Sequence, residues 1–334
     1  MNCCSTRPAA YDRQNDRNTA ERGLLVAPVL EHLDSMVDLA AYTPVDLPRL
    51  STPTVIEPLS YEAIYADLLA GLQAMVPDFD ATIESDPAVK LLQLVAYREM
   101  LIRAKINDAA RAVMPAFAVG ADLDQLAALF GILRLVRDPG DPTRGVPATL
   151  ETDDEFRRRL VLAPEGYSVA GPEGAYIFHA LSADPAVLDA SATSPSPGRV
   201  VVTILSRGGD GTAPAALVAT VAAYLSAETR RPMTDAVTVQ SATIIPYAVA
   251  ATIRTFDGPD AAIVLATARA RLDAYVAACH RLGRDVARSG ILAALHVEGV
   301  VTVQLTSPAA DIAIDRTQAP WCSGIAITHG GTGE

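Results

Sequence analysis

The sequence has little of what membrane or secreted proteins need. No run approaches the roughly 18 consecutive apolar residues of a membrane span, and the first residues have no basic segment followed by an apolar one. Four cysteines are present, but they form no framework of spaced pairs, which is typical of a reducing compartment. We therefore expect a soluble chain that is made in the cytoplasm and not inserted into a membrane.

Cations and aromatic side chains are also scarce. The chain has 27 Lys and Arg against 39 Asp and Glu, which gives a net charge of −12, and aromatic residues make up 5% of it. Nucleic-acid binding needs clustered cations and often aromatic surfaces on which bases stack. An anionic membrane surface likewise needs cations. These observations argue against nucleic acid and lipid as direct partners.

Motifs for chemistry are missing from the sequence. The five histidines are dispersed, and no CxxC, HxxxH, HExxH or GxSxG motif occurs. The glycine-rich segment 208–211 lacks the Lys-Ser/Thr that a phosphate loop needs, so we interpret it as a turn with positive φ. Asp153 and Asp154 lie where a helix begins and need no catalytic role. We expect no catalytic, cofactor or metal site, although an enzyme or an unrelated cytoplasmic scaffold with an unrecognised site in the second half remains the alternative.

The chain of 334 residues is long enough for two or three domains, and half of its residues are apolar. Residues 1–42 are predicted to be a disordered leader, with Met36 as an alternative start. Residues 43–59 contain four prolines, which predict an extended arm laid over a surface, either of this chain or of a neighbouring subunit. Residues 60–136 are predicted to form a helical bundle domain.

Two amphipathic helices dominate this bundle. One covers 61–76 with Ser60 as its N-cap, and the next begins at Asp86-Pro87 and continues to Met114. A third is expected to open at Asp122 with a capping box to Gln125. The long helix has a stripe with the 3.5-residue period of a helix bundle or coiled coil: Ala88, Leu92, Val95, Glu99, Ile102, Ile106, Ala109 and Val113.

A second stripe of Leu91, Leu94, Arg98 and Leu101 runs beside the first. The long helix either packs inside its own domain or forms a seam that another chain completes. Both interpretations stay open from the spacing alone.

The second half alternates short helices and strands. Residues 137–147 are predicted to be a linker, 148–256 an α+β module, and 257–334 a second module that partly repeats the first. We place strands at 187–192, 199–205, 237–239, 244–253 and 300–305, and helices at 152–160, 174–182, 214–225, 260–280 and 289–296. Arg157, Arg158 and Arg159 are consecutive in the first of these helices and should point in different directions.

An internal repeat supports the two modules. Ala180–Pro195 matches Ala294–Pro308 with one gap, and each copy has a helix end, a turn, a strand and Ser-Pro. The predicted fold is therefore α+β, with a long-helix bundle region followed by two or more small modules with short, mostly antiparallel sheets.

Several stretches together resemble the baseplate J family of contractile phage tails and related injection systems. They are LPRLSTPTVIEPLSYEAIYADLL at 47–69, ETDDEFRRRLVLAPEGYSVAGPEGAYIFHAL at 151–181, PGRVVVTIL at 197–205, and LGRDVARSGILAALHVEGVVTVQLTSPAADI at 282–312. The resemblance covers about residues 45–330 and rests on the order and spacing of these stretches.

The resemblance implies a structural baseplate wedge subunit, assembled in the host cytoplasm, in a ring that surrounds the hub and spike and rearranges on sheath contraction. Implied partners are copies of the chain, other wedge proteins, hub or spike proteins and sheath-initiation proteins. N-terminal helices in this family typically join a helical bundle, which would make the first stripe an interface. At the C-terminal end the matched positions are Arg284, Asp285, Ser289 and Gly299. Arg284 and Asp285 would form an interface ion pair, or, in the alternative, Gly299 makes a turn and Ser289 caps a helix.

Overall fold

A computed structural model of the chain describes residues 47, 50–51, 53–80, 83, 85–258 and 260–333. The predicted leader and the first part of the arm lie outside these residues. The chain divides into two compact units, Tyr42–Ala242 and the unit that contains Thr243–Glu334. Each unit has its own architecture.

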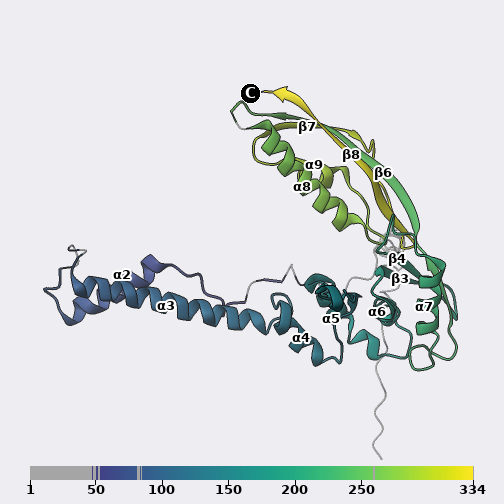
Figure 1. Cartoon of the computed structure of the whole chain (residues 1–334), viewed down its shortest axis with the longest axis horizontal. Helices are drawn as coiled ribbons and strands as arrows, with labels where there is room; N and C mark the ends of the chain where they lie inside the picture. Colours follow the sequence, from purple (N-terminus) through teal and green to yellow (C-terminus); the bar gives the residue numbers. More distant parts are fainter. Residues whose placement is uncertain are drawn as a thin grey trace, which may run out of the picture. The chain divides into compact units, whose positions relative to one another are not determined.

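The first unit begins with a pair of helices, α2 (Tyr61–Met75) and α3 (Pro87–Ala112), which lie side by side (Figure 1). Ser60 caps α2 by accepting a hydrogen bond from the Ala63 N–H. Asp86 caps α3 by accepting one from the Ala88 N–H at 2.7 Å, and Pro87 occupies the first helical position. The caps predicted at Ser60 and Asp86 are confirmed.

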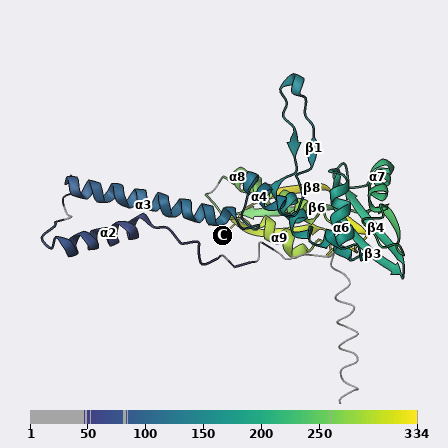
Figure 2. The same cartoon turned by 90° about the horizontal axis from the view of Figure 1, so that it is seen from below.

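The next segment folds back into a β-hairpin rather than a linker. Strand β1 (Val136–Asp138) pairs antiparallel with β2 (Thr149–Leu150), and the short 3-10 helix η2 (Pro142–Arg144) forms the tip (Figure 2). At the tip Gly140 has a φ of 67°, and an added Cβ would lie 2.4 Å from the Val146 carbonyl oxygen. Composition alone predicted a linker here because proline and glycine are shared by linkers and tight turns.

Helix α4 (Gly120–Ala128) packs on α5 (Asp153–Leu162) around a small core of Ala118, Leu123, Ala127, Ile132, Phe156, Leu160 and Ala163. Residues 118–132 and 156–163 therefore share one core, although the sequence placed them in different domains. The capping box predicted at Asp122 is wrong, since α4 begins at Gly120, whose N–H donates to Asp153 Oδ2 at 3.1 Å. The capping box of Thr152 and Glu155 in α5 is present.

The base of the hairpin is tied to α5 by a buried ion pair. Arg159 donates from Nε and Nη2 to both carboxylate oxygens of Glu151 at 2.8 and 2.7 Å, and both side chains are less than 8% exposed. Glu151 also accepts from the Leu135 N–H at 3.2 Å. Arg134 lies over the ring of buried Phe156 and pairs with Asp153 at 2.6 Å. Removal of one partner from such a pair would leave an uncompensated buried charge, so this junction fixes the hairpin on the unit.

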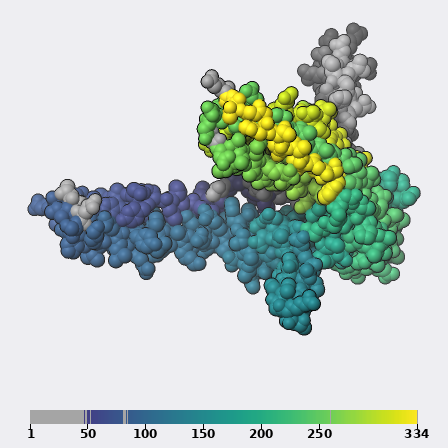
Figure 3. Space-filling model, turned by 45° about the horizontal axis from the view of Figure 1, so that its top comes forward, coloured from purple at the N-terminus to yellow at the C-terminus, as the bar shows by residue number. Residues whose placement is uncertain are grey.

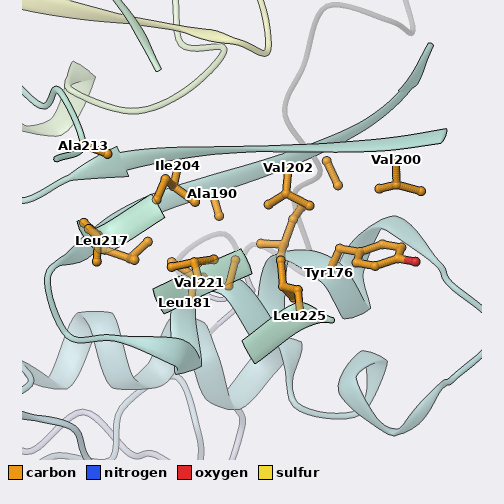
Figure 4. Close-up of a cluster of buried hydrophobic side chains, with 14 of the residues drawn as sticks. Tyr176, Leu181, Ala190, Val200, Val202, Ile204, Ala213, Leu217, Val221 and Leu225 are labelled. Atoms are coloured by element: carbon orange, nitrogen blue, oxygen red, sulfur yellow. The ribbon is translucent and has the colours of Figure 1, made fainter. Parts of the chain in front are cut away.

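The rest of the first unit is a three-stranded sheet covered by two helices. After the short 3-10 helix η3 (Glu165–Tyr167) come α6 (Glu173–Ala183), β3 (Val187–Ser196), β4 (Arg199–Ser206), α7 (Ala215–Leu225) and β5 (Ala236–Ser241). The strand order is β3-β4-β5, antiparallel and then parallel. Figure 4 shows the side chains of Val200, Val202 and Ile204 facing α6 and α7 across a core of aliphatic residues.

The second unit is another three-stranded sheet with two helices. It consists of β6 (Thr243–Thr255), α8 (Ala261–Cys279), α9 (Arg288–Leu295), β7 (Val300–Ser307) and β8 (Gln318–Thr332), with strand order β7-β6-β8. Alternate residues of β6 from Tyr247 to Ile253 are buried under α8 and α9 (Figure 1). In the described part of the chain β6 pairs with β7 and β8 alone, and the division into units falls after Ala242 rather than at the predicted 256.

The two sheets share one arrangement with a different chain order. In each, the central strand has an antiparallel neighbour that follows a helix and a parallel neighbour on its other side. The two copies of the internal repeat coincide with α6–β3 and α9–β7, so both repeat copies have the predicted helix-turn-strand form. In the first sheet the central strand β4 follows the helix-turn-strand segment α6–β3, whereas in the second sheet the central strand β6 precedes the segment α9–β7.

The α+β class is confirmed, and the predicted strands and helices of the second half are present within a few residues of their predicted ends. Strand β8 was missed, because Pro320, Gly324 and Gly330 interrupt its apolar pattern. The glycine-rich turn has the expected positive φ, at 64° for Gly209 and 101° for Gly211.

A buried histidine in the first unit generates a prediction. His179 of α6 is 8% exposed, and among the described residues its Nδ1 has no hydrogen-bond partner. Burial, and secondly the charge of Arg230, lowers the pKa of His179 below its usual 6.5. The unfolded chain then binds a proton at this residue at a higher pH than the folded chain does. Protonation of the unfolded chain at His179 therefore leaves the free energy of unfolding unaffected above about pH 6.5. It lowers that free energy as the pH falls from there toward the pKa of His179 in the folded chain.

We expect the free energy of unfolding of His179→Phe in urea at about pH 8 to lie within about 1 kcal/mol of the parent value. Between about pH 7 and 5 this free energy should fall less in the variant than in the parent. Urea titrations at several pH values measure this. Equal slopes for the two proteins would contradict the assignment.

Candidate interface surfaces

The candidate sites among the described residues are surfaces of exposed apolar side chains. Among the described residues, no group of three or more His, Cys, Asp or Glu side chains could hold a metal ion. Within the same residues, no helix combines the length and apolar character of a membrane span. The features that call for an explanation are large apolar side chains left in solvent, and α3 carries seven of them, more than any other described helix or strand.

Helix α3 uses one stripe to pack inside its own chain. Val89, Ala96 and Asn107 are 1%, 0% and 5% exposed, and α2 contributes Ile64 at 7%. These positions of α3 share one face because seven and eleven residues complete nearly whole numbers of helical turns. This stripe differs from the two that the heptad spacing identified.

The first predicted stripe lies mostly in solvent. Val95, Ile102, Ile106 and Val113 are 48%, 60%, 56% and 67% exposed. They lie about 110° around the helix from the stripe that faces α2. Ala109 is exposed as well, while Ala88 and Leu92 are half-buried. In Figure 3 the spheres of α2 cover one side of α3, and the blue flank beside them is bare.

The end of the arm is fastened to α3 through Asn107. Its side-chain amide accepts from the Glu57 N–H at 3.1 Å and donates to the Glu57 carbonyl oxygen at 2.9 Å. Arg103 pairs with Glu99 at 2.6 Å and lies 3.4 Å from the Glu57 carboxylate. The part of the arm around Glu57 therefore lies on this chain's own long helix.

A hollow of about 400 Å³ opens where the arm meets α3. Its lining residues are Thr54, Val55, Glu57, Arg103, Ile106 and Asn107. Val55 and Ile106 are each at least half exposed. The hollow lies beside the first stripe and could receive an apolar side chain from a helix packed there.

The sequence did not identify Asn107 or Glu57 as site residues. The available signal was a polar residue on the stripe of α3 that contains Val89 and Ala96. A buried amide needs hydrogen-bond partners, and an extended proline-rich segment has free backbone groups to supply them.

The three consecutive arginines of α5 separate as predicted. Arg157 donates to the Pro115 and Ala118 carbonyl oxygens, Arg158 pairs with Asp189 at 2.6 Å, and Arg159 pairs with Glu151. All three bind within the chain, so they form no external anion clamp.

The C-terminal candidate residues have structural neighbours of their own. Asp285 Oδ1 accepts from the Ile314 N–H at 2.7 Å, and Arg284 is exposed. Gly299 makes a turn with a φ of 90°. Ser289 is not the helix cap, because Ala287 occupies the N-cap position and Asp311 accepts from the Arg288 N–H at 2.7 Å.

Exposed apolar stripes on a long helix are typical of a subunit that assembles with other proteins. Three domain families match it in order: the baseplate J-like N-terminal domain at 84–141, the baseplate J-like central domain at 168–241, and the baseplate J-like protein C-terminal domain at 247–328. Baseplate protein J of Escherichia phage P2 is 44% identical over 299 residues, which are 87% of this chain and 99% of that protein.

The chain therefore belongs to the baseplate J family, as its sequence stretches predicted, and is a structural component of a phage tail baseplate that interacts with other baseplate components. A solved structure of the anti-feeding prophage baseplate matches 55% of this chain and 44% of its own chain, at 15% identity and a TM-score of 0.33. That likeness is too low to define the fold.

The Asn107 clamp generates the second prediction. Asn107→Ala removes two hydrogen bonds, which contribute about 1–3 kcal/mol together. The Glu57 amide should then exchange its hydrogen roughly ten- to a hundredfold faster, which hydrogen-exchange mass spectrometry measures. Asp108→Ala, at the exposed neighbouring position, should leave the exchange of Glu57 unchanged. Equal rates in Asn107→Ala and the parent would show that the amide does not hold the arm.

Proposed function

We propose that this chain is a wedge subunit of the baseplate of a contractile tail or tail-like particle. It joins a ring around the hub and spike, and this ring rearranges when the sheath contracts. Its partners are further copies of itself, other wedge proteins, and hub or spike and sheath-initiation proteins. Assembly takes place in the bacterial host cytoplasm.

The observation that carries the proposal is the solvent exposure of the first stripe. Val95, Ile102, Ile106 and Val113 form an apolar row at heptad spacing that α2 does not cover. A monomer gains nothing from such a row, because each exposed aliphatic side chain forfeits about 1.5–3 kcal/mol of burial. A bundle with a helix of another subunit removes this cost, with Ala88, Leu92 and Ala109 completing the seam.

The division of the chain into two compact units supports the proposed rearrangement of the ring, because each unit can make its own contacts with other subunits. Packed interfaces switch between discrete arrangements rather than deform continuously. We assign the permanent contact to the α3 seam and the switching contacts to the C-terminal unit, at the surface that includes Arg284, Asp285, Ser289 and Gly299. Arg284 is exposed there and free to pair across an interface.

The seam assignment is tested by Val95→Asp together with Ile102→Asp. Both positions are about half exposed or more in the single chain. The isolated variant should therefore unfold within about 1 kcal/mol of the parent. In a complementation experiment it should be at least about tenfold depleted from particles, because two carboxylates would be buried in the bundle.

Tyr97→Asp is the matched control, since Tyr97 is 49% exposed on α3 but lies on neither stripe. This variant should be incorporated like the parent chain. Normal incorporation of the double variant would reject the seam as an interface, whereas a double variant that unfolds would show that the stripe is internal core.

A further inference from the structure

Helix α3 carries a second unpartnered row, distinct from the first stripe. Leu91, Leu94 and Leu101 are 61%, 56% and 42% exposed, at the same alternating spacing of three and four residues. The next positions in this spacing are Arg98 and Lys105. The row lies about 160° around the helix from the stripe that packs on α2. A helix that packed on the first stripe would leave much of this row in solvent.

The two cations in this row have no anion to pair with in the described part of the chain. Arg98 and Lys105 are both exposed, and no carboxylate of a described residue lies within ion-pair distance of either. The arginines elsewhere on α3 differ: Arg103 pairs with Glu99 at 2.6 Å, and Arg111 pairs with Asp108 at 3.5 Å. Lys90, outside the row, also lacks an anion but donates to Gln93 Oε1 at 3.2 Å. Among the described residues, the α3 cations with neither an ion pair nor a hydrogen bond thus both lie on the apolar row.

Cations at otherwise apolar seam positions restrict the partner. A helix packed on Leu91, Leu94 and Leu101 removes water from Arg98 and Lys105. A buried cation is costly unless a carboxylate pairs with it. Polar residues at seam positions also fix the register and the choice of partner. The partner must therefore place Asp or Glu opposite these two positions.

A second copy of α3 does not meet this requirement. The helix has five cations (Lys90, Arg98, Arg103, Lys105 and Arg111) against Glu99 and Asp108, so it contributes +3 to a chain with a net charge of −12. Antiparallel pairing about Leu101 would bring Arg98 near Lys105, and parallel pairing would bring each cation beside itself. Like charges at such distances oppose association. The acidic α2 of a second copy is already packed on its own α3.

We propose that the row of Leu91, Leu94, Arg98, Leu101 and Lys105 binds an acidic amphipathic helix of a different subunit. The proposal rests on the bundle proposed above and adds a second seam with its own partner chemistry. Helix α3 then packs on α2 with one face, on a first partner through Val95 and Ile102, and on the acidic helix through this row.

Replacement of both cations by leucine distinguishes an acidic partner from an apolar one. Incorporation into particles should fall if the partner helix is acidic, and stay equal or rise if it is apolar. Arg98→Leu with Lys105→Leu leaves the partner's carboxylates buried and unpaired, so we expect it to be at least about tenfold depleted from particles in competition with the parent chain. Arg98→Glu with Lys105→Glu should be depleted at least as strongly. Equal or better incorporation of the leucine variant would overturn the proposal.

The matched control is Lys90→Glu with Arg111→Glu, which makes the same charge change on α3 away from both rows. It should be incorporated within about threefold of the parent. If it were depleted as strongly as Arg98→Glu with Lys105→Glu, the effect would belong to the net charge of the helix, and the proposal would fail. Loss of assembly in Val95→Asp with Ile102→Asp, but not in the leucine variant, would keep the wedge function and reject the second seam.

The identity of the partner is read by photocrosslinking in the complete particle, with a benzophenone amino acid at position 94 and a control at 97. Position 94 should cross-link to another protein, at a helical peptide with Asp or Glu at heptad spacing, and position 97 should not. A cross-link to a second copy of α3, to residues 1–46 of this chain or to a peptide without acidic residues would overturn the proposal. So would assembled particles that yield no cross-link from position 94.

Discussion

A long helix with one covered face is the constraint on which the rest of this structure depends. Helix α3 has 26 residues and buries Val89, Ala96 and Asn107 against α2 and the arm, while six of its aliphatic side chains stay in solvent: Leu91, Leu94, Val95, Leu101, Ile102 and Ile106. The hydrophobic effect favours removal of those side chains from water, and no described element of the chain removes them. We infer that burial of these exposed side chains of α3 provides the free energy for association with a partner. The arm held by Asn107 forms one side of the surface around the first stripe.

A second network of polar contacts joins three elements of the first unit. The Arg159–Glu151 pair and the contacts of Arg134 join α4, α5 and the β1–β2 hairpin around Phe156. A buried charge network has few alternative arrangements, because each opening leaves a charge without its partner. Such a junction holds the surfaces that it supports at fixed positions within its unit, which is what a structural component of a baseplate requires.

Much of this could be predicted from the sequence, and the failures have physical reasons. Heptad spacing located the stripes of α3, and β-branched alternation located β6 and β7, since both signals come from burial on one face. Spacing could not show which of the three stripes of α3 packs on α2. That choice depends on the contact between Asn107 and the arm at Glu57, and these two residues are 50 positions apart in the sequence. Glycine and proline hid β8 and made the hairpin at 136–150 resemble a linker. The ion pairs of Arg159 and Arg134 join segments whose proximity only the fold reveals.

Side-chain accessibility of α3 in the free chain and in the assembled particle most directly tests whether other subunits complete this helix. Hydroxyl-radical footprinting reports it residue by residue. Leu91, Leu94, Ile102 and Ile106 should be oxidised readily in the isolated chain and protected in the particle, whereas exposed Met75, on α2, should be labelled in the isolated chain. Equal oxidation of the α3 side chains in both states would contradict the claim that this helix is completed by other subunits.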